Sequence, residues 1–321
     1  MLTRREALMA AGSAVTAGIL APRTVLSKAS QPGTPVAFEM PENACDCHTH
    51  IIGDPQQFPF VTPRVYTPET AFPDEMSALH RALKIKRVVI VTPSFYGSDN
   101  SASLWGMKAR GPDARGVAVI DDKTSDADLD ALHRAGMRGI RLNLATGGTN
   151  DPSVARRQVQ TAVDRVKARN WHVQMYTNLA VISSLKDVVM ASPVPFVFDH
   201  FGGAQAALGT EQPGFGDLLA MVKAGKAYVK ISGAYRSSKQ GPDYPDTAPF
   251  AKALIAANVD RIVWGTDWPH TNSAGAKAPT DIAPHSQIDD GRLLNQLAVW
   301  APDAATRKKI LVDNPARLYG Y

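Results

Sequence analysis

The chain is organised around one stretch near its amino end, Ala44-Cys45-Asp46-Cys47-His48-Thr49-His50-Ile51-Ile52, whose pattern predicts a buried strand. Because residues two apart in a strand point to the same face, His48 and His50 can direct both imidazoles at one ion or one substrate atom. A second stretch, Val263-Trp264-Gly265-Thr266-Asp267-Trp268-Pro269-His270, is an apolar run that stops at Asp267. A carboxylate at a strand end is where a barrel enzyme places a general base or a metal ligand.

Eight apolar runs of strand length recur along the chain at fairly regular spacing. They cover residues 44–51, 87–92, 116–120, 139–144, 172–177, 195–200, 227–232 and 261–266. Segments with apolar residues at helical spacing lie between most of them, at residues 126–135, 153–169, 179–190, 215–224 and 249–257. Apolar strands that alternate with helices are typical of a parallel sheet buried on both faces, so we predict an α/β fold, a single-domain (β/α)8 TIM barrel over residues 44–321. A doubly wound dinucleotide-binding sheet is the alternative, but no G-x-G-x-x-G turn follows the first strand.

The composition is that of one large globular domain. Of 321 residues, 44% are hydrophobic and 20% are charged, which is ample for a large core. The formal net charge is +5, but residues 1–29 hold four basic residues and one acidic residue. The rest of the chain is therefore close to neutral. Because it has no basic stripe interleaved with aromatic residues, nucleic acid is not an expected partner.

The amino terminus resembles a twin-arginine (Tat) export signal. Thr3-Arg4-Arg5-Glu6-Ala7-Leu8 precedes a small and apolar run from Met9 to Leu20, and Ser27-Lys28-Ala29 resembles a small-x-small cleavage site. We therefore expect residues 1–29 to be a signal peptide, residues 30–43 a linker, and the mature protein to be periplasmic. If the segment is instead an amphipathic helix, the protein would be cytoplasmic. No stretch is long enough to span a bilayer, so no membrane contact is expected after export.

Polar and ionisable side chains gather at the carboxyl ends of the predicted strands, where barrel enzymes build their sites. The candidate site residues are His48, His50, Tyr66, Ser94, Arg141, Tyr176, His200, Arg236, Asp267 and His270. Some have alternative roles: Arg141 could pair with a barrel carboxylate, the two tyrosines could be core aromatics, and Ser94 could cap a helix.

The chemistry of this set points to an acyl group and an anionic substrate. Asp267 is the candidate general base, drawing a proton from a water that attacks a carbonyl carbon. The three histidines could hold one divalent ion together with Asp267, since three imidazoles and a carboxylate suit zinc. Alternatively, with no cofactor required, they could hydrogen-bond the developing oxyanion. The planar guanidinium groups of Arg141 and Arg236 suit a carboxylate.

The remaining histidines are expected outside the site. His80, His133 and His285 fall in helix-like or loop segments and are expected to contact solvent. His172 opens a strand at the end opposite to the site. No feature of the sequence indicates an oligomeric state.

These motifs resemble those of the amidohydrolase superfamily. Asp46-x-His48-x-His50 on the first strand, His200 after the sixth and Gly265-Thr266-Asp267-Trp268-Pro269-His270 after the eighth carry the resemblance, which extends from about Ala44 to Tyr321. More narrowly, the chain resembles the 2-pyrone-4,6-dicarboxylate lactonase branch. In that branch an aspartate at the position of Asp267 activates water. The lactone is surrounded by the residues that match His48, His50, Tyr66, Ser94, Arg141, Tyr176, His200 and Arg236.

The chain departs from that branch at two positions. The pyrone dicarboxylate lactonases have a further arginine shortly after the one matching Arg141, where this chain continues Asn143-Leu144-Ala145-Thr146-Gly147-Gly148. They also have an arginine three residues after the sixth-strand histidine, where this chain has Gly203. Because fewer guanidinium groups leave a second carboxylate without partners, the resemblance implies a different anionic lactone. A muconolactone with one acidic group, such as a sulfomuconolactone, or a sugar-acid lactone is expected.

The resemblance implies a lactone hydrolase and leaves the metal open. Relatives of this kind include metal-free enzymes and enzymes that use zinc or manganese. A two-metal site is not expected, because Tyr176 stands where two-metal relatives offer a histidine. Two alternatives to hydrolysis remain: a lactone isomerase or decarboxylase on the same scaffold, and an exported binding protein without catalysis. The presence of His48, His50, His200 and Asp267 together disfavours the binding protein.

Overall fold

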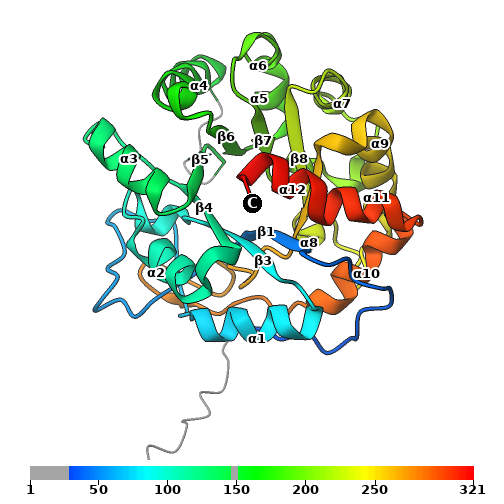
Figure 1. Ribbon diagram of the computed structural model, residues 1–321, viewed down its shortest axis with the longest axis horizontal. Helices are drawn as coiled ribbons and strands as arrows, with labels where there is room; N and C mark the ends of the chain where they lie inside the picture. Colours follow the sequence, from blue (N-terminus) through cyan, green and yellow to red (C-terminus); the bar gives the residue numbers. More distant parts are fainter. Residues whose placement is uncertain (1–28, 146–150) are drawn as a thin grey trace, which may run out of the picture.

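Eight parallel strands form the centre of the molecule (Figure 1). The computed structural model describes residues 29–145 and 151–321. The strands follow one another around the sheet in chain order: β1 (Cys45–Thr49), β3 (Arg87–Val91), β4 (Ala114–Ala118), β5 (Met137–Asn143), β6 (His172–Tyr176), β7 (Phe196–Phe198), β8 (Ala227–Ser232) and β9 (Ile262–Gly265). Each strand overlaps one of the eight predicted runs. The prediction of a parallel eight-stranded α/β domain is therefore confirmed, and the arrangement is that of a TIM barrel.

The first and last strands meet and close the barrel. The backbone N–H of Asp267, just after β9, donates to the carbonyl of His48 in β1 at 2.8 Å. The Asp46 carboxylate accepts two further hydrogen bonds, from the backbone N–H of Thr266 at 3.0 Å and from its hydroxyl at 2.6 Å. This seam joins residues that are 220 positions apart in the chain.

Helices surround the strands (Figure 1). They are α1 (Pro73–Leu83), α2 (Ser101–Arg110), α3 (Asp126–Arg134), α4 (Pro152–Val166), α5 (Leu179–Ser184), α6 (Lys186–Ala191), α7 (Phe215–Lys223), α8 (Ala234–Ser237), α9 (Ala248–Asn258), α10 (Asp290–Trp300), α11 (Ala304–Lys308) and α12 (Asn314–Tyr319). Beside the barrel, β2 (Thr67–Pro68) and β10 (Ile282–Ala283) pair in a separate two-stranded sheet. This small sheet ties the segment after β1 to the segment after β9.

One predicted helix is in fact two. The apolar periodicity predicts a single helix over residues 179–190, whereas α5 ends at Ser184 and α6 begins at Lys186. The hydroxyl of Ser184 donates to the carbonyl of Val181. Serine side chains that bond to nearby carbonyls compete with the helical pattern, which accounts for the break.

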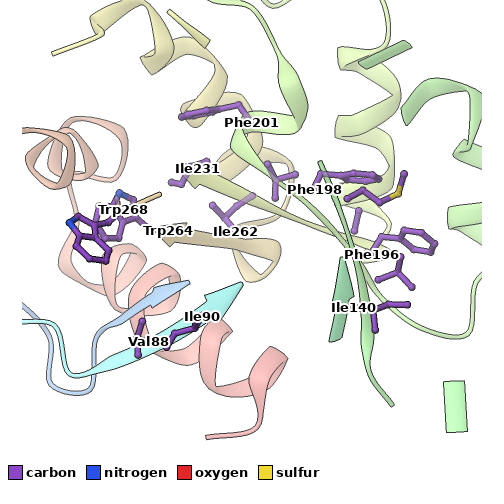
Figure 2. Packing of buried hydrophobic residues seen from close by; sticks show 14 of the residues in the cluster. Val88, Ile90, Ile140, Phe196, Phe198, Phe201, Ile231, Ile262, Trp264 and Trp268 are labelled. Carbon is purple, nitrogen blue, oxygen red and sulfur yellow. The ribbon is translucent and has the colours of Figure 1, made fainter. Parts of the chain in front are cut away.

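Two apolar clusters fill the barrel and the layer outside it. On the outer face of the strands, Phe196 and Phe198 of β7 lie among residues that pack toward the helices, with Ile231 on the adjacent β8 and Ile262 on β9 beyond it (Figure 2). The inner cluster consists of Cys45, Cys47, Val89, Val91, Val117, Val197, Tyr228, Val263 and Tyr319. Tyr319 belongs to α12, which lies across one end of the barrel (Figure 1). The inside of the barrel is therefore apolar at this end, and the polar candidate residues occupy the other.

A bulge in β1 places the histidine pair. Between the paired positions Asp46 and Thr49, β1 has one more residue than β3. An extra residue shifts the alternation of side chains, so Cys47 in the inner apolar cluster and the adjacent His48 both turn toward the barrel interior. His50 then follows His48 on the same face, as the sequence predicts.

The segment before β1 runs along the outside of the barrel. The indole N–H of Trp268 donates to the Ser30 carbonyl at 3.2 Å, and the Thr34 hydroxyl donates to Asp289 at 2.7 Å. Apart from Ala29, which is buried, the predicted signal peptide lies outside the described residues. Within the described part of the chain, no helix has both the length and the apolar character needed to cross a membrane.

Candidate active site

Three imidazoles and one carboxylate meet at the carboxyl end of the barrel. The Nε2 atoms of His48, His50 and His200 lie 3.6, 3.8 and 3.7 Å from Oδ1 of Asp267. All four residues are almost fully buried. The sequence places these four residues at the ends of three strands. The fold thus brings them together at one point.

The second ring nitrogen of two of these histidines is anchored to the barrel. Nδ1 of His50 lies 2.7 Å from the carbonyl oxygen of Val91, and Nδ1 of His200 lies 3.0 Å from the hydroxyl of Ser232. Because a carbonyl only accepts hydrogen bonds, Nδ1 of His50 carries the hydrogen and Nε2 presents a lone pair to Asp267. Burial lowers the pKa of both histidines to about 4, so the imidazoles are neutral at pH 7.

His48 stands on a buried polar network beneath the site. Its Nδ1 lies 3.2 Å from Asp199 and 3.3 Å from the Lys230 ammonium. Lys230 also donates to the amide oxygen of Gln174 at 2.7 Å, and Arg141 binds Asp199 at 3.0 and 3.1 Å. Burial opposes the ionisation of Asp199, but the His48 imidazole and the two cations outweigh it and hold its pKa well below the usual range.

The two oxygens of Asp267 have different surroundings. Oδ2 accepts hydrogen bonds from the Tyr235 hydroxyl, at 2.6 Å, and from Nε of Arg236. Oδ1 and the Nε2 atom of His48 are buried and have no hydrogen-bond partner among the described residues. Burial disfavours the charged form of Asp267, but the charge of the Arg236 guanidinium outweighs it and holds the pKa of Asp267 well below the usual range. The carboxylate is therefore ionised, with one oxygen held and one available.

The Gly265-Thr266-Asp267 turn requires its glycine. A Cβ atom on Gly265 would lie 2.8 Å from both the backbone nitrogen and the Cβ of His48, so only glycine lets β9 approach β1 this closely. Asp267 itself has a φ of +68°, in the left-handed region. Its hydrogen bond to β1 holds this unusual backbone conformation and directs the side chain into the barrel.

A cavity of about 340 Å³ opens above the cluster. Eight of the ten candidate residues line it: His50, Tyr66, Ser94, Arg141, Tyr176, His200, Arg236 and Asp267. His48 is completely buried beneath them and touches Asp267 from below. Strand ends that are distant in the sequence therefore enclose one space of a size suited to a small molecule.

His270 lies outside this cavity, although the sequence places it among the substrate-binding candidates. Its side chain is fully buried behind the cavity wall. Nδ1 lies 3.3 Å from the Tyr235 hydroxyl, and Nε2 lies 2.9 Å from the carboxylate of Asp290. The turn after Pro269 points the imidazole away from the space where a substrate would bind.

The two arginines bind other residues of the barrel and also line the cavity. Arg141 pairs with the barrel carboxylate Asp199, and its guanidinium lies 5.3 Å from the centre of the Tyr176 ring. Arg236 uses Nε for Asp267 and Nη2 for the carbonyl of Thr271, at 3.2 Å. Both side chains still line the cavity. The structural role of Arg141 that the sequence left open and an anion-binding role are therefore compatible.

The neutral polar candidates stand around the rim. The Tyr66 hydroxyl donates to the Thr271 hydroxyl at 2.9 Å and ties the segment after β1 to the turn after β9. Ser94 begins a short 3-10 helix after β3. The Tyr176 ring contacts His200 edge-on at 5.6 Å. Together they add hydroxyl groups to the cavity, where the Tyr176 ring lies beside the Arg141 guanidinium.

Several buried polar residues of the site were not among the sequence candidates. Asp199 precedes His200 directly, and Lys230 is the one charged residue within the β8 sequence Ala227-Tyr228-Val229-Lys230-Ile231-Ser232. A charge inside an apolar strand is a signal that a buried partner exists. Tyr235 gave no comparable signal, because its contact with Asp267 depends on the course of the chain after β8.

Two of the four remaining histidines differ from expectation. His80 and His285 are buried, and His133 is half-buried and accepts a hydrogen bond from Trp171 at 2.8 Å. The prediction of solvent contact is therefore wrong for His80 and His285, whereas His133 keeps part of its surface in solvent. His80 lies on the inner face of α1 and bonds to Asp46 at 3.1 Å. His172 does lie at the end of the barrel opposite to the site, where its ring contacts Tyr319.

Acidification should destabilise the fold through its buried histidines. Burial lowers the pKa of His50 and His200 to about 4 and that of His172 to about 3, against about 6.5 in an unfolded chain. The stability that the neutral imidazoles contribute is complete above about pH 6.5 and is lost as the pH falls through the folded values, because the unfolded chain binds these protons first. Asp290, whose pKa is raised by burial to about 6, acts in the opposite sense but is a single group.

We therefore expect the Tm to fall steadily between pH 7 and pH 4, measured by thermal unfolding in a series of buffers. A Tm that stays constant over this range would contradict the neutral, buried state of the three histidines.

Comparison with known proteins agrees with this geometry. A family model described as Amidohydrolase, Amidohydro_2, matches residues 45–321. The chain belongs to the amidohydrolase family. It is 34% identical to a 2-pyrone-4,6-dicarboxylate hydrolase of Comamonas testosteroni over 88% of this chain and 92% of the relative. It is 34% identical to a 4-sulfomuconolactone hydrolase of Rhizobium radiobacter, over 89% and 93% of the two chains. To a D-galactarolactone isomerase of Agrobacterium fabrum it is 30% identical, over 77% and 80%.

The membership agrees with the resemblance that the motifs indicate. All three of these amidohydrolase relatives carry names that refer to small acidic lactones. Each match extends over more than three quarters of both proteins, so the similarity concerns the whole barrel and not one motif.

Proposed function

We propose that this amidohydrolase opens the ring of an anionic lactone by adding water to the ester carbonyl, with Asp267 as general base. The observation that carries the proposal is the buried Oδ1 of Asp267, which faces three imidazoles at the floor of a cavity that also contains Arg141 and Arg236. A base, an acyl-polarising cluster and anion-binding groups in one small space suit ester hydrolysis. The names of the hydrolase relatives support the same reaction.

The residues have distinct roles in this reaction. Oδ1 of Asp267 takes the proton of the attacking water, while Tyr235 and Arg236 hold Oδ2 in place. The cavity faces of Arg141 and Arg236 bind the acidic group of the substrate, which turns the lactone carbonyl toward the imidazoles. Because the pKa of Asp267 is low, the base is always ionised but weakly basic. The attacking water or the carbonyl must therefore be activated by a further group.

The four residues at the floor fit one divalent ion. The donor atoms of His48, His200 and Asp267 lie within 4.8 Å of one another, and Nε2 of His50 faces the same oxygen. Neutral imidazoles with anchored Nδ1 atoms and an ionised carboxylate are the donor set of zinc sites. A bound ion would supply Lewis acidity, lowering the pKa of water and polarising the carbonyl. Direct oxyanion binding is less suited to His50, because its Nε2 has no hydrogen to donate.

Removal of this ion should abolish turnover. We expect dialysis against a chelator to reduce kcat to background, and zinc or manganese to restore it, with metal content measured on the same samples. Full activity after chelation, with far less than one ion per chain, would contradict the proposed ion and make the histidines direct partners of the substrate.

We expect the preferred substrate to bear one acidic group and not the two of a dicarboxylate. Among the described residues, two arginines line the cavity, and Gly203 offers no room for a third: a Cβ there would lie 2.5 Å from the carbonyl oxygen of Thr177, at a φ of +77°. A second carboxylate would be buried without a charged partner. Because a hydrogen bond to a charged group contributes about 1.5–3 kcal/mol, its loss corresponds to roughly 10- to 100-fold in kcat/KM.

The decisive experiment is a panel of lactones assayed in water labelled with oxygen-18. It should include 2-pyrone-4,6-dicarboxylate, a sulfomuconolactone and a sugar-acid lactone. We expect a lactone with one acidic group to give the highest kcat/KM, and its product to contain one labelled oxygen. Turnover without labelled oxygen would indicate an isomerase, the alternative that the galactarolactone relative supports. Failure to turn over any lactone would refute the proposal.

A further inference from the structure

We infer that Tyr235, His270 and Asp290 form a hydrogen-bonded chain whose task is to hold the carboxylate of Asp267 in its working orientation. The inference deepens the proposed function and rests on it. The Tyr235 hydroxyl contacts Oδ2 of Asp267 at 2.6 Å, Nδ1 of His270 contacts that hydroxyl at 3.3 Å, and Nε2 of His270 contacts Asp290 at 2.9 Å. The chain thus runs from the reacting carboxylate to the first turn of α10.

The direction of the hydrogen bonds is fixed by the groups themselves. The Asp267 carboxylate only accepts, so the one hydroxyl hydrogen of Tyr235 points to it. The tyrosine oxygen must then accept from Nδ1–H of His270. The proton between Nε2 of His270 and Asp290 can reside on either partner without changing this arrangement. With Nδ1–H of His270 donating to the tyrosine oxygen, the Tyr235 hydroxyl keeps its own hydrogen on Asp267.

The last two members of the chain cannot touch a substrate. His270 and Asp290 are both completely buried, and neither lines the cavity. His270 comes from the turn that follows Asp267, and Asp290 from α10 on the outside of the barrel. They are positioning residues that act through Tyr235.

The need for such a chain follows from the position of Arg236. This arginine contacts only Oδ2 of Asp267 through Nε, and its Nη2 binds the Thr271 carbonyl. An arginine and a carboxylate prefer a bidentate pair with two parallel hydrogen bonds. Without the tyrosine hydroxyl, the carboxylate would turn toward the guanidinium and withdraw Oδ1 from the three imidazoles. Tyr235 opposes this rotation, and His270 holds Tyr235 in place.

Three variants test the chain. Tyr235→Phe removes the hydroxyl alone. In His270→Asn the side-chain amide can replace the Nδ1 donor to Tyr235 but cannot reach Asp290. In His270→Gln the amide can replace the Nε2 contact with Asp290 but leaves Tyr235 without its donor. We expect crystal structures of Tyr235→Phe and His270→Gln to show the Asp267 carboxylate rotated toward Arg236, and that of His270→Asn to show it unchanged. The kcat of the first two should fall about 10- to 100-fold with KM within about twofold.

His172→Asn is the matched control, because it also replaces a fully buried histidine but at the opposite end of the barrel. Its kcat should equal that of the wild type, whatever it costs in Tm. An unrotated carboxylate in Tyr235→Phe, or equal losses of kcat in His270→Asn and His270→Gln, would overturn the inference. If the wild-type protein turns over no lactone, the proposed function fails, but the crystal structures still decide the orientation of Asp267.

Discussion

Asp267→Asn should lower kcat by about 10²- to 10⁴-fold, the range that a positioned general base contributes, and leave the barrel folded. The asparagine amide has the shape of the carboxylate. Its oxygen can accept the hydrogen bonds from Tyr235 and Arg236, which hold Oδ2 in the wild-type protein. The amide nitrogen then faces the imidazoles and cannot take a proton from water. The measurement is steady-state kinetics on the best lactone of the panel, with circular dichroism to confirm the fold.

The control for this variant is Asp187→Asn, on the surface of α6. The Asp187 side chain is 70% exposed and pairs with Arg156, and neither residue lines the cavity, so kcat should not change. Near-normal kcat in Asp267→Asn itself would refute the assignment of the base and move the chemistry to the histidines.

The largest loss of stability is expected for Asp199→Ala. The Asp199 carboxylate is buried between Arg141, at 3.0 Å, and Lys230, at 3.5 Å. Its removal leaves one or two cations buried without a counter-charge, and breaking a buried ion pair in this way costs about 3–5 kcal/mol. Urea unfolding of both proteins gives the difference in the free energy of unfolding.

Asp187→Ala removes a partner of an exposed ion pair and serves as the comparison. Exposed pairs contribute at most about 1 kcal/mol, so its unfolding curve should nearly overlay that of the wild type. Asp199→Ala could instead lower the free energy of unfolding no more than this surface change does. That result would show that the buried network of Asp199, Arg141, Lys230 and His48 does not stabilise the fold electrostatically.

The architecture could be predicted because it depends on patterns that are local in the sequence. Buried parallel strands are apolar throughout, so eight such runs are visible without knowledge of their neighbours. The carboxyl ends of parallel strands lie at one end of a barrel. His48, His50, His200 and Asp267 could therefore be assigned to a common site from their positions in the runs alone. Each of these inferences needs only the order of residues along one strand.

The features that could not be predicted depend on pairs of distant residues. The bulge that turns both Cys47 and His48 inward is a difference in length between β1 and β3, which neither strand shows alone. Whether His270 faces the cavity or Tyr235 depends on the turn after Asp267. The burial of His80 could not be predicted for the same reason. Whether one face of a helix is buried depends on the distant residues that pack against it.

The closure of the barrel also has a consequence for the time at which the protein can fold. The Asp46 carboxylate in β1 has its partner at Thr266, 220 residues later. At a synthesis rate of about 5–20 residues per second, β1 waits roughly 10–40 s before its second neighbour is made. Until then the histidine strand has one unpaired edge, and the nascent chain depends on folding assistance or on rapid elongation to avoid pairing with another copy.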